Sequence, residues 1–577
     1  MNRLFPTLSA ATKLTLPRWN LHSISKPLSS VGMALSIWLL PTVGTMRPAQ
    51  ASERIYISYG ALERSISVAS LETYAKTGKI NDELAPYTQR VNQQQLAQLR
   101  RVLLSRINLN AVAVSQFFYT PIGERLLERL GEVIQIKARQ PQPGFYAIRA
   151  ALILAADDPQ GLTLLNLLRK FPTSGIEIDL ARSLQISEDL EKLINQTNQA
   201  VALVSQQSAT EATSQPQKVN FSRLPDLRRR GQFTWTKQTL TLNNPQRSLQ
   251  FLADIYLPRS NVRAPVIVIS YGLGEDRTTF EYLAQHLASY GFVVGIPQNP
   301  GSSAEQLQAL LAGRANDVAK PSEFINRTLY VKLLLDELQR RSQSDPTFKV
   351  NVQQVGVIGQ SFGGYTALAL AGAPLNFKQL KKDCASLNNS LNLSLLLQCR
   401  ALQLPPGQYN LRDERVKAVI ALNPIASSVF GQASLSQIQI PVMLVSGSID
   451  TIAPALSEQI LPFTWLTTPK KYLVVLKGGT HFSTVGESKM DTGSVPLPPQ
   501  VIGPDPAAAR RYTNALSVAF FQTYVTGVPQ YRSYLSASYA QAISQAPLGL
   551  SLVQSLTATQ LTQALNGSNT DTTTQSP

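Results

Sequence analysis

Hydrophobic and polar positions follow two different patterns, one before and one after residue 220. After residue 220, short runs of apolar and β-branched residues alternate with amphipathic helical windows. Runs that are apolar at every position predict strands buried on both faces, and strand–helix alternation predicts a mostly parallel sheet. We therefore expect an α/β fold with an eight-stranded sheet and helices on both faces. The strand candidates are 231–242, 249–256, 265–271, 292–297, 354–359, 416–422, 441–446 and 472–476.

Residues 52–205 show mainly the period of amphipathic helices. Leu96, Leu99 and Leu103, for example, fall on one helical face. Two short alternating runs after residue 53 predict a small hairpin. Polar residues without an aromatic side chain follow, a composition typical of a linker. The predicted organisation is a mainly helical domain over 52–205, a linker over 206–220, an α/β domain over 221–530, and a C-terminal extension over 531–577 that ends in a disordered tail.

The first 51 residues have the pattern of a secretory signal peptide. They contain basic but no acidic residues and an apolar stretch, VGMALSIWLLPTV, that is short for a membrane span. Ala49 and Ala51 place small side chains at positions −3 and −1 of a cut before Ser52. We expect residues 1–51 to direct export by the general secretion route to a periplasm, a lumen or the cell exterior. An uncleaved membrane anchor is the alternative.

Composition limits the chemistry that the chain can perform. Three histidines and two cysteines in 577 residues exclude a cysteine-based zinc or iron–sulfur site, so we expect neither metal nor cofactor. Of the net charge of +17, five positive charges belong to residues 1–51 and +12 remains in the rest of the chain; this excess favours peripheral contact with an anionic membrane surface, or is only a solvated basic surface. Basic clusters without interleaved aromatic residues argue against nucleic acid. In an exported protein, Cys384 and Cys399 are expected to form a disulfide, with two buried thiols as the alternative.

A nucleophile motif occupies residues 359–363, which read GQSFG. This G-x-S-x-G pattern lies between the apolar run VGVIG and an apolar helical window. In that strand–turn–helix setting the serine is placed on a sharp turn at the end of a strand, and the glycines permit the tight backbone. Ser361 is therefore the candidate nucleophile.

A serine hydroxyl needs a base, and the chain offers few histidines for that role. His22 belongs to the expected signal, and His286 falls in a predicted helix that covers the sheet, so we interpret it as structural. His481 follows a predicted strand in a glycine-rich loop, where it can reach the nucleophile. Asp450 also follows a strand, and the order Ser361, Asp450, His481 is typical of nucleophile-elbow hydrolases. We expect His481 to be the base and Asp450 its acceptor.

Two backbone N–H groups are expected to form an oxyanion hole. One belongs to Phe362, the residue after the nucleophile. The other belongs to the loop after the third strand, which reads SYGLGE over 270–275. Within that loop Leu273 is the preferred donor and Gly274 the alternative.

The segments YGLGEDRTTF, GQSFGGYTAL, GSID and GGTHF resemble the α/β-hydrolase fold. They are most similar to dienelactone-hydrolase-like proteins and platelet-activating-factor acetylhydrolases, which typically show H-G-L-G and G-H-S-F-G-G. Tyr271 and Gln360 stand where those motifs have histidine. In the acetylhydrolases the acid follows the sixth strand; here that place reads LNP over 422–424 and has no carboxylate, so the acid role moves to Asp450. The resemblance covers about 230–527, and the N-terminal part resembles the uncharacterised domain that precedes such hydrolases in exported cyanobacterial proteins.

This resemblance implies a serine hydrolase that cleaves carboxylic esters, including lipid or phospholipid acyl esters, by a Ser-His-Asp acyl-enzyme mechanism. A small-molecule or lipid ester is then the expected substrate. Two alternatives remain open. A peptidase can be built on the same fold and triad, and a hydrolase-like protein can have lost catalysis and kept only binding.

Overall fold

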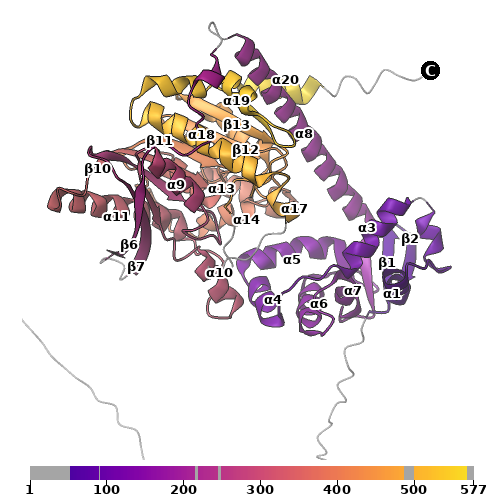
Figure 1. Ribbon diagram of the computed structural model, residues 1–577. Coiled ribbons are helices and arrows are strands. Elements are labelled where there is room, and N and C mark those ends of the chain that lie inside the picture. Colours follow the sequence, from indigo (N-terminus) through magenta and orange to yellow (C-terminus); the bar gives the residue numbers. More distant parts are fainter. Residues whose placement is uncertain (1–51, 90, 215–218, 245–248, 487–498, 568–577) are drawn as a thin grey trace, which may run out of the picture. The chain divides into compact units, whose positions relative to one another are not determined.

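The computed structural model describes residues 52–89, 91–214, 219–244, 249–486 and 499–567 (Figure 1). The expected signal peptide over 1–51 and the end of the C-terminal tail lie outside these residues. No helix in the described ranges combines the length and the apolar character that a membrane span needs.

The larger part of the chain is built on one nine-stranded sheet. Its six middle strands are parallel, whereas the strands toward both edges pair antiparallel with their neighbours. Eight of the strands were predicted, and the ninth, β14, comes from the C-terminal extension. In chain order they are β6 (Trp235–Asn244), β7 (Leu249–Pro258), β8 (Ala264–Ser270), β9 (Val293–Pro297), β10 (Val350–Gln360), β11 (Val416–Leu422), β12 (Val442–Gly447), β13 (Lys471–Lys477) and β14 (Gly549–Val553).

The strand order places two loops side by side at the carboxyl ends of the parallel strands, which we call the site edge of the sheet. Across the sheet the order is β14–β13–β12–β11–β10–β8–β9–β7–β6, so β10 lies between β8 and β11. In the register of β8 and β10, Gly359 pairs with Ser270. Because both strands are parallel, the turn after β10 and the loop after β8 leave the sheet together, which is the usual place for a site in an open α/β sheet.

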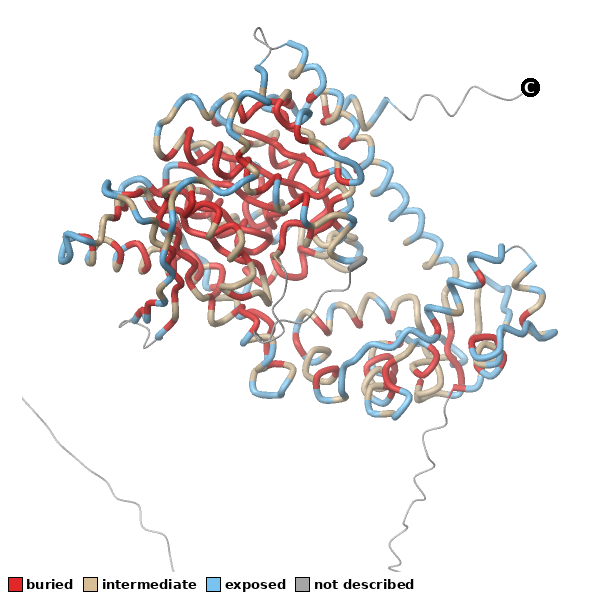
Figure 2. Tube along the Cα trace, viewed as in Figure 1, coloured by how far each residue is buried: buried red, intermediate tan, exposed pale blue. Residues whose placement is uncertain are grey.

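Helices cover both faces of this sheet, and the strands bury alternate side chains on each face. Val266 and Val268 of β8 belong to one core cluster, whereas Ile267 and Ile269 belong to the other. The buried residues are concentrated around this sheet in Figure 2. The first face is covered by α11 (Glu323–Ser344), α12 (Phe362–Leu370) and α16 (Leu461–Trp465), and the second by α9 (Glu281–Ser289), α18 (Pro506–Tyr524) and α19 (Ala537–Ile543).

The N-terminal region is mixed α/β, so the prediction of a mainly helical domain was wrong in part. It contains a second, five-stranded sheet in the order β2–β1–β5–β3–β4. The predicted hairpin is present as β1 and β2, whereas the other strands are short and β5 pairs with β1 and β3, which are distant in sequence. They are β1 (Arg54–Tyr59), β2 (Leu62–Ser67), β3 (Ile134–Ile136), β4 (Gln142–Pro143) and β5 (Gly175–Asp179); the longer helices are α1 (Val68–Thr77), α3 (Gln93–Leu104), α4 (Ala111–Phe118), α5 (Pro121–Val133) and α6 (Phe145–Asp157).

One long helix, α8 (Leu180–Thr213), follows β5. It contacts β1 and β5 of the small sheet, and also β14, α19 and α20 (Ala558–Asn566) of the larger part. Ala200, Val201 and Val204 join the core cluster of the large sheet. The segment 206–220, interpreted as a linker from its polar composition, is therefore helical as far as Thr213. Its Gln, Ser and Ala residues are those of an exposed helix rather than of a flexible connection.

Candidate active site

Ser361 lies on a strained turn between β10 and α12. Its backbone has φ 54° and ψ −114°, a left-handed region that residues other than glycine rarely adopt. The neighbouring glycines are required by space: a Cβ on Gly359 would come 2.0 Å from the Gly363 carbonyl oxygen. A Cβ on Gly363 would come 1.8 Å from the Ser270 carbonyl oxygen. The turn therefore holds Ser361 at the start of α12 in a conformation that the packing of two backbones enforces.

His481 and Asp450 form a buried hydrogen-bonded pair. His481 follows β13 and Asp450 follows β12, so both lie at the edge of the sheet from which Ser361 also emerges. His481 Nδ1 and Asp450 Oδ2 are 2.7 Å apart, and the two residues are 3% and 6% exposed. This contact leaves Nε2 as the imidazole nitrogen with which the ring can accept a proton.

The Asp450 carboxylate accepts three further hydrogen bonds. Oδ1 accepts from the backbone N–H groups of Ile452 and Ala453, both at 2.8 Å. Oδ2 accepts from Asn423 Nδ2 at 2.7 Å, so the same oxygen binds both Asn423 and His481. Asn423 directly follows β11 and has a positive φ of 44°. Sequence reasoning gave Asn423 no role, although its place at the acetylhydrolase acid position was the signal that could have found it.

Ser361 and His481 approach the same region without a direct hydrogen bond. Among the residues that the structure describes, none of the hydrogen bonds joins Ser361 Oγ to the imidazole of His481. Catalytic hydrogen bonds of this kind often tighten only when a substrate binds. The arrangement thus brings Asp450 and His481 together and places Ser361 at the same sheet edge.

The loop after β8 is fixed at several backbone groups, and one N–H group remains available. Gly274 N–H donates to the Ser302 carbonyl oxygen at 2.9 Å, and Gly272 N–H donates to Glu275 Oε2 at 2.7 Å. Within the described ranges, neither Leu273 N–H nor Phe362 N–H has a hydrogen-bond acceptor. Gly274, the alternative donor for an oxyanion hole, is thus engaged elsewhere, whereas the two preferred groups are unpaired.

Two residues that replace the motif histidines hold this region together. Gln360 Nε2 donates to the carbonyl oxygen of His481 at 3.0 Å, linking β10 to the His481 loop. The Tyr271 hydroxyl accepts from Asn299 N–H at 2.7 Å. Both side chains are buried, and burial raises the pKa of Tyr271. Gln360 and Tyr271 therefore connect loops through neutral hydrogen bonds.

Glu275 adds a titratable group to the loop of Leu273. Burial raises the pKa of its carboxyl to about 7, although the bond from Gly272 N–H and the neighbouring His481 oppose this rise. Near neutral pH a part of the molecules therefore carries an uncharged Glu275, which lowers the negative charge beside Leu273.

His286 lies apart from this group of residues. It belongs to α9 on the face of the sheet, is 3% exposed, and its Nε2 lies 3.0 Å from the Leu227 carbonyl oxygen. Burial lowers the pKa of His286 to about 4, so the ring is neutral over the usual pH range.

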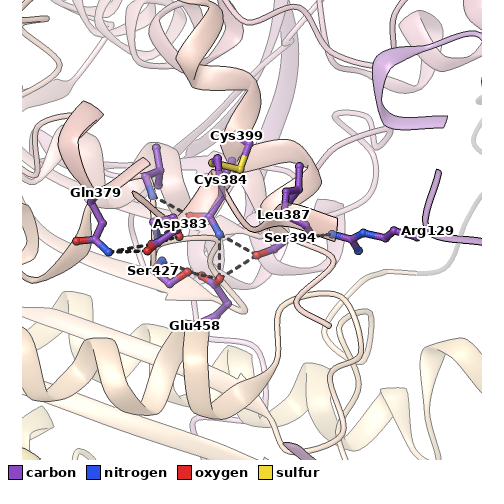
Figure 3. Close-up of a disulfide and its surroundings, with 12 residues drawn as sticks. Arg129, Gln379, Asp383, Cys384, Leu387, Ser394, Cys399, Ser427 and Glu458 are labelled. Carbon is purple, nitrogen blue, oxygen red and sulfur yellow. Dashed lines mark hydrogen bonds between the residues drawn. A yellow bond between two sulfur atoms is a disulfide. The ribbon is translucent and has the colours of Figure 1, made fainter. Parts of the chain in front are cut away.

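An insertion that precedes β11 contains a disulfide between Cys384 and Cys399, whose Cα atoms are 5.8 Å apart (Figure 3). Next to it, the fully buried Glu458 accepts from Ser394 Oγ and Gln398 Nε2 of the insertion, both at 2.9 Å. The same carboxylate accepts from Ala426 N–H, just after β11. Hydrogen bonds thus join the insertion to the loops that hold Asp450 and Asn423.

The part of the chain that the structure describes contains no cluster of candidate metal ligands. There, no group of three or more His, Cys, Asp or Glu side chains is arranged to hold a metal ion.

Two family models match separate parts of the chain. The model described as "Alpha/beta hydrolase of unknown function (DUF1400)" matches residues 51–179, ahead of the large sheet. The chlorophyllase model matches residues 225–387. The second match includes Ser361 and the loop of Leu273 but ends before Asp450 and His481.

Curated relatives include bacterial cutinases. Cutinase 2 of Thermobifida cellulosilytica is 24% identical over 251 residues, which cover 41% of this chain and 70% of that protein. Cutinase cut1 of Thermobifida fusca has the same identity over the same length and is covered to 58%. Together with the mostly parallel nine-stranded sheet, these matches show that the chain is similar to α/β-hydrolases, and among them to chlorophyllase and the cutinases.

Proposed function

We propose that this protein is a serine hydrolase that cleaves carboxylic esters, with Ser361 as nucleophile, His481 as base and Asp450 as its acceptor. The observation that carries the proposal is the strained turn of Ser361 at the same sheet edge as the buried His481–Asp450 pair. A strained serine between two glycines that cannot carry a Cβ has a conformational cost, and such costs concentrate at functional sites.

The geometry supports an acyl-enzyme mechanism. Ser361 Oγ attacks the ester carbonyl carbon while His481 Nε2 takes its proton, and Asp450 stabilises the imidazolium. The negative carbonyl oxygen of the tetrahedral intermediate accepts from Leu273 N–H and Phe362 N–H. His481 then protonates the leaving alcohol, and water, activated by the same base, hydrolyses the acyl-enzyme and restores Ser361.

Lipid or phospholipid acyl esters are the substrates that we propose within this class. Similarity to chlorophyllase and to cutinases supports an ester bond, and the motif resemblance to platelet-activating-factor acetylhydrolases supports a lipid acyl group. Without residues 1–51, which contain five basic and no acidic residues, the net charge is still +12, and this excess supports peripheral contact with an anionic lipid surface. We also propose export by the general secretion route, since the first 51 residues have a signal pattern and a disulfide suits an oxidising compartment.

Covalent labelling tests the nucleophile without knowledge of the substrate. A fluorophosphonate probe is expected to label the folded protein at Ser361, as located by peptide mass spectrometry. Ser361→Ala should abolish labelling, whereas Ser436→Ala, at a half-buried serine after α15 (Gly431–Leu435), should leave it unchanged. A folded wild-type protein without label would exclude a working nucleophile and leave a non-catalytic binding protein.

A substrate panel then separates esterase from peptidase activity. The p-nitrophenyl esters of acyl chains from acetyl to palmitoyl are compared with peptide p-nitroanilides and with phospholipid vesicles. We expect ester cleavage that depends on acyl length, and faster phospholipid cleavage on anionic than on neutral vesicles. Peptide anilide cleavage above ester cleavage would instead assign the same triad to a peptidase.

A further inference from the structure

Arg327 of α11 is fully buried beneath the loop that carries Leu273. Its side chain has no solvent exposure and donates three hydrogen bonds. Nη1 donates to the Tyr271 carbonyl oxygen at 2.6 Å, and Nη2 donates to the Gly272 carbonyl oxygen at 3.1 Å. Nε donates to Ser302 Oγ at 3.0 Å. A single guanidinium group thus binds two successive peptide groups of this loop.

The second of these bonds determines where Leu273 N–H points. The Gly272 carbonyl and the Leu273 N–H belong to one planar trans peptide group, in which the two point in opposite directions. Binding of the Gly272 oxygen by Arg327 therefore turns Leu273 N–H away from Arg327. In the described part of the chain that N–H has no acceptor, so it stays available for an oxygen of the substrate.

Arg327 also contacts the residue that offers the other N–H group. The centre of its guanidinium lies 4.4 Å from the centroid of the Phe362 ring. Phe362 is the residue after the nucleophile and is itself fully buried. One side chain therefore touches both residues whose N–H groups we assign to the oxyanion hole.

The charge of Arg327 is balanced only indirectly. Among the described residues, no carboxylate oxygen lies within 4.0 Å of its guanidinium, the distance that defines an ion pair. Ser302 Oγ accepts from Arg327 and donates to Glu323 Oε2 at 2.8 Å, and Glu323 is 1% exposed. A buried cation without a direct counter-ion is costly, and packing alone does not explain why the chain retains it.

We propose that Arg327 is a positioning residue of the oxyanion hole: it holds the loop carbonyls so that Leu273 N–H and Phe362 N–H converge on the ester oxygen. This assignment rests on the proposed serine hydrolase function. The hydrogen bonds from Leu273 N–H and Phe362 N–H to the ester carbonyl oxygen become stronger as that oxygen becomes negative. Arg327 therefore stabilises the transition state more than the bound substrate. Its positive charge beside the loop favours the same developing charge.

The planar guanidinium suits this role better than a lysine would. Arginine presents several N–H donors in a fixed fork, whereas the lysine ammonium is a compact charge on a flexible chain. Arg327→Lys keeps the charge but cannot bind both carbonyls and Ser302 in the same plane. Arg327→Met keeps much of the volume and removes both charge and donors.

The test compares these variants on a p-nitrophenyl ester and on the matched thionoester, in which sulfur replaces the carbonyl oxygen. Sulfur accepts hydrogen bonds poorly, so the thionoester gains little from the oxyanion hole. We expect Arg327→Met to lower kcat for the ester by roughly 100-fold, the effect of losing one oxyanion donor. KM should change by less than about threefold, because uniform binding is retained. The kcat of Arg327→Lys for the ester should lie between that of Arg327→Met and that of the wild type.

The ratio of ester to thionoester rates is the readout that a merely structural role would not move. It should fall in Arg327→Met, because the ester rate drops while the thionoester rate changes little. The matched control is Arg415→Met. Arg415 donates to the carbonyl oxygen of Lys332, which lies in α11 as Arg327 does. Arg415 itself precedes β11 and so lies at the amino ends of the parallel strands, away from the site. That variant should lower the melting temperature and leave the rate ratio at the wild-type value.

Three kinetic results would overturn the assignment. A folded Arg327→Met with wild-type kcat would do so, as would equal losses for ester and thionoester. If Arg327→Met fails to fold, Arg327→Lys decides by the same ratio, and an unchanged ratio there counts against the role. Fluorophosphonate labelling of the wild type separates the two proposals, because absence of label at Ser361 overturns the hydrolase function itself and the role of Arg327 with it.

Discussion

The two buried histidines of the large domain are equally hidden from solvent but differ in their partners. His286 and His481 are each 3% exposed. His286 lies in α9 on the face of the sheet, and its ring meets the Leu227 carbonyl oxygen. His481 lies in a loop at the carboxyl ends of the strands, and its ring meets the Asp450 carboxylate. Because the two histidines are equally buried, any difference in their chemistry comes from their hydrogen-bond partners and their places in the fold.

The partner decides what each ring can do. Burial alone disfavours the charged imidazolium, and a carbonyl oxygen compensates only weakly, which is why the pKa of His286 is lowered to about 4. A carboxylate fixes the tautomer and stabilises the imidazolium that forms during proton transfer. A buried histidine in this fold is therefore a candidate base only where a strand-end carboxylate faces it.

Replacement of each histidine by glutamine should give the largest contrast. His481→Gln is expected to lower kcat/KM for a p-nitrophenyl ester by roughly 10⁴-fold to 10⁶-fold, since the base is lost. His286→Gln keeps a donor for the Leu227 carbonyl and should leave kcat/KM within about threefold of the wild type, because the His286 ring makes no contact with Ser361, His481 or Asp450. Initial rates on folded protein, checked by circular dichroism, measure both. Similar losses in the two variants would refute the distinction.

Removal of the carboxylate is expected to have the next largest effect. Asp450→Asn should lower kcat by roughly 10³-fold to 10⁴-fold, because His481 loses its acceptor and takes the wrong tautomer. The control is Asp413→Asn, a buried carboxyl that binds Arg415 at the opposite edge of the sheet. Asp413→Asn should reduce stability and leave kcat unchanged. Retained activity in Asp450→Asn would assign the acceptor role elsewhere.

The comparison also predicts a difference in acid stability. His286 has a lowered pKa in the folded state, so its contribution to stability is complete above the unfolded pKa of 6.5 and is lost as the pH falls toward 4. The loss amounts to about 3 kcal/mol across that interval. His286→Gln cannot take up a proton, so its free energy of unfolding should fall less over the same range. Urea denaturation at pH 7.5, 6, 5 and 4.5 measures both proteins, and parallel curves would contradict the argument.

Residues in strong local patterns were predictable from the sequence. The GQSFG segment specifies a tight turn through its glycines, and Asp450 and His481 each directly follow an apolar strand. Because parallel strands end at one edge, the sequence was enough to predict that Asp450 and His481 would meet, and their side chains are 2.7 Å apart. The eight predicted strands are also present, because six of them are short, mainly apolar runs and the first two, β6 and β7, alternate apolar and polar residues.

Features that depend on distant contacts were not predictable. Arg327 lies in a helical window with polar neighbours, and only its bonds to the carbonyls of Tyr271 and Gly272 reveal its burial. β14 is a five-residue strand in a polar extension, and its pairing with β13 crosses a long stretch of chain. In the small N-terminal sheet only the β1–β2 hairpin was predicted, and the rest was missed because its short strands are joined through the pairing of β1 with β5, far apart in sequence. Strand formation depends strongly on such partners.

Asn423 offers the finest test of what separates the two histidines, because His286 has no counterpart to it. Asn423 Nδ2 and His481 Nδ1 share Asp450 Oδ2, so Asn423 fixes the oxygen that the imidazole meets. Its φ of 44° makes Asn423→Ala strained, whereas Asn423→Gly removes the side chain and tolerates the backbone.

We expect Asn423→Gly to lower kcat by roughly 10-fold, which corresponds to the loss of one hydrogen bond to a charged group. The melting temperature of this variant should change little. Asn423→Ala should show the same loss in kcat and a lower melting temperature, because strain is added to it. If Asn423→Gly keeps the wild-type kcat while Asn423→Ala loses stability, the residue serves the backbone turn alone, and Asp450 needs no help to orient His481.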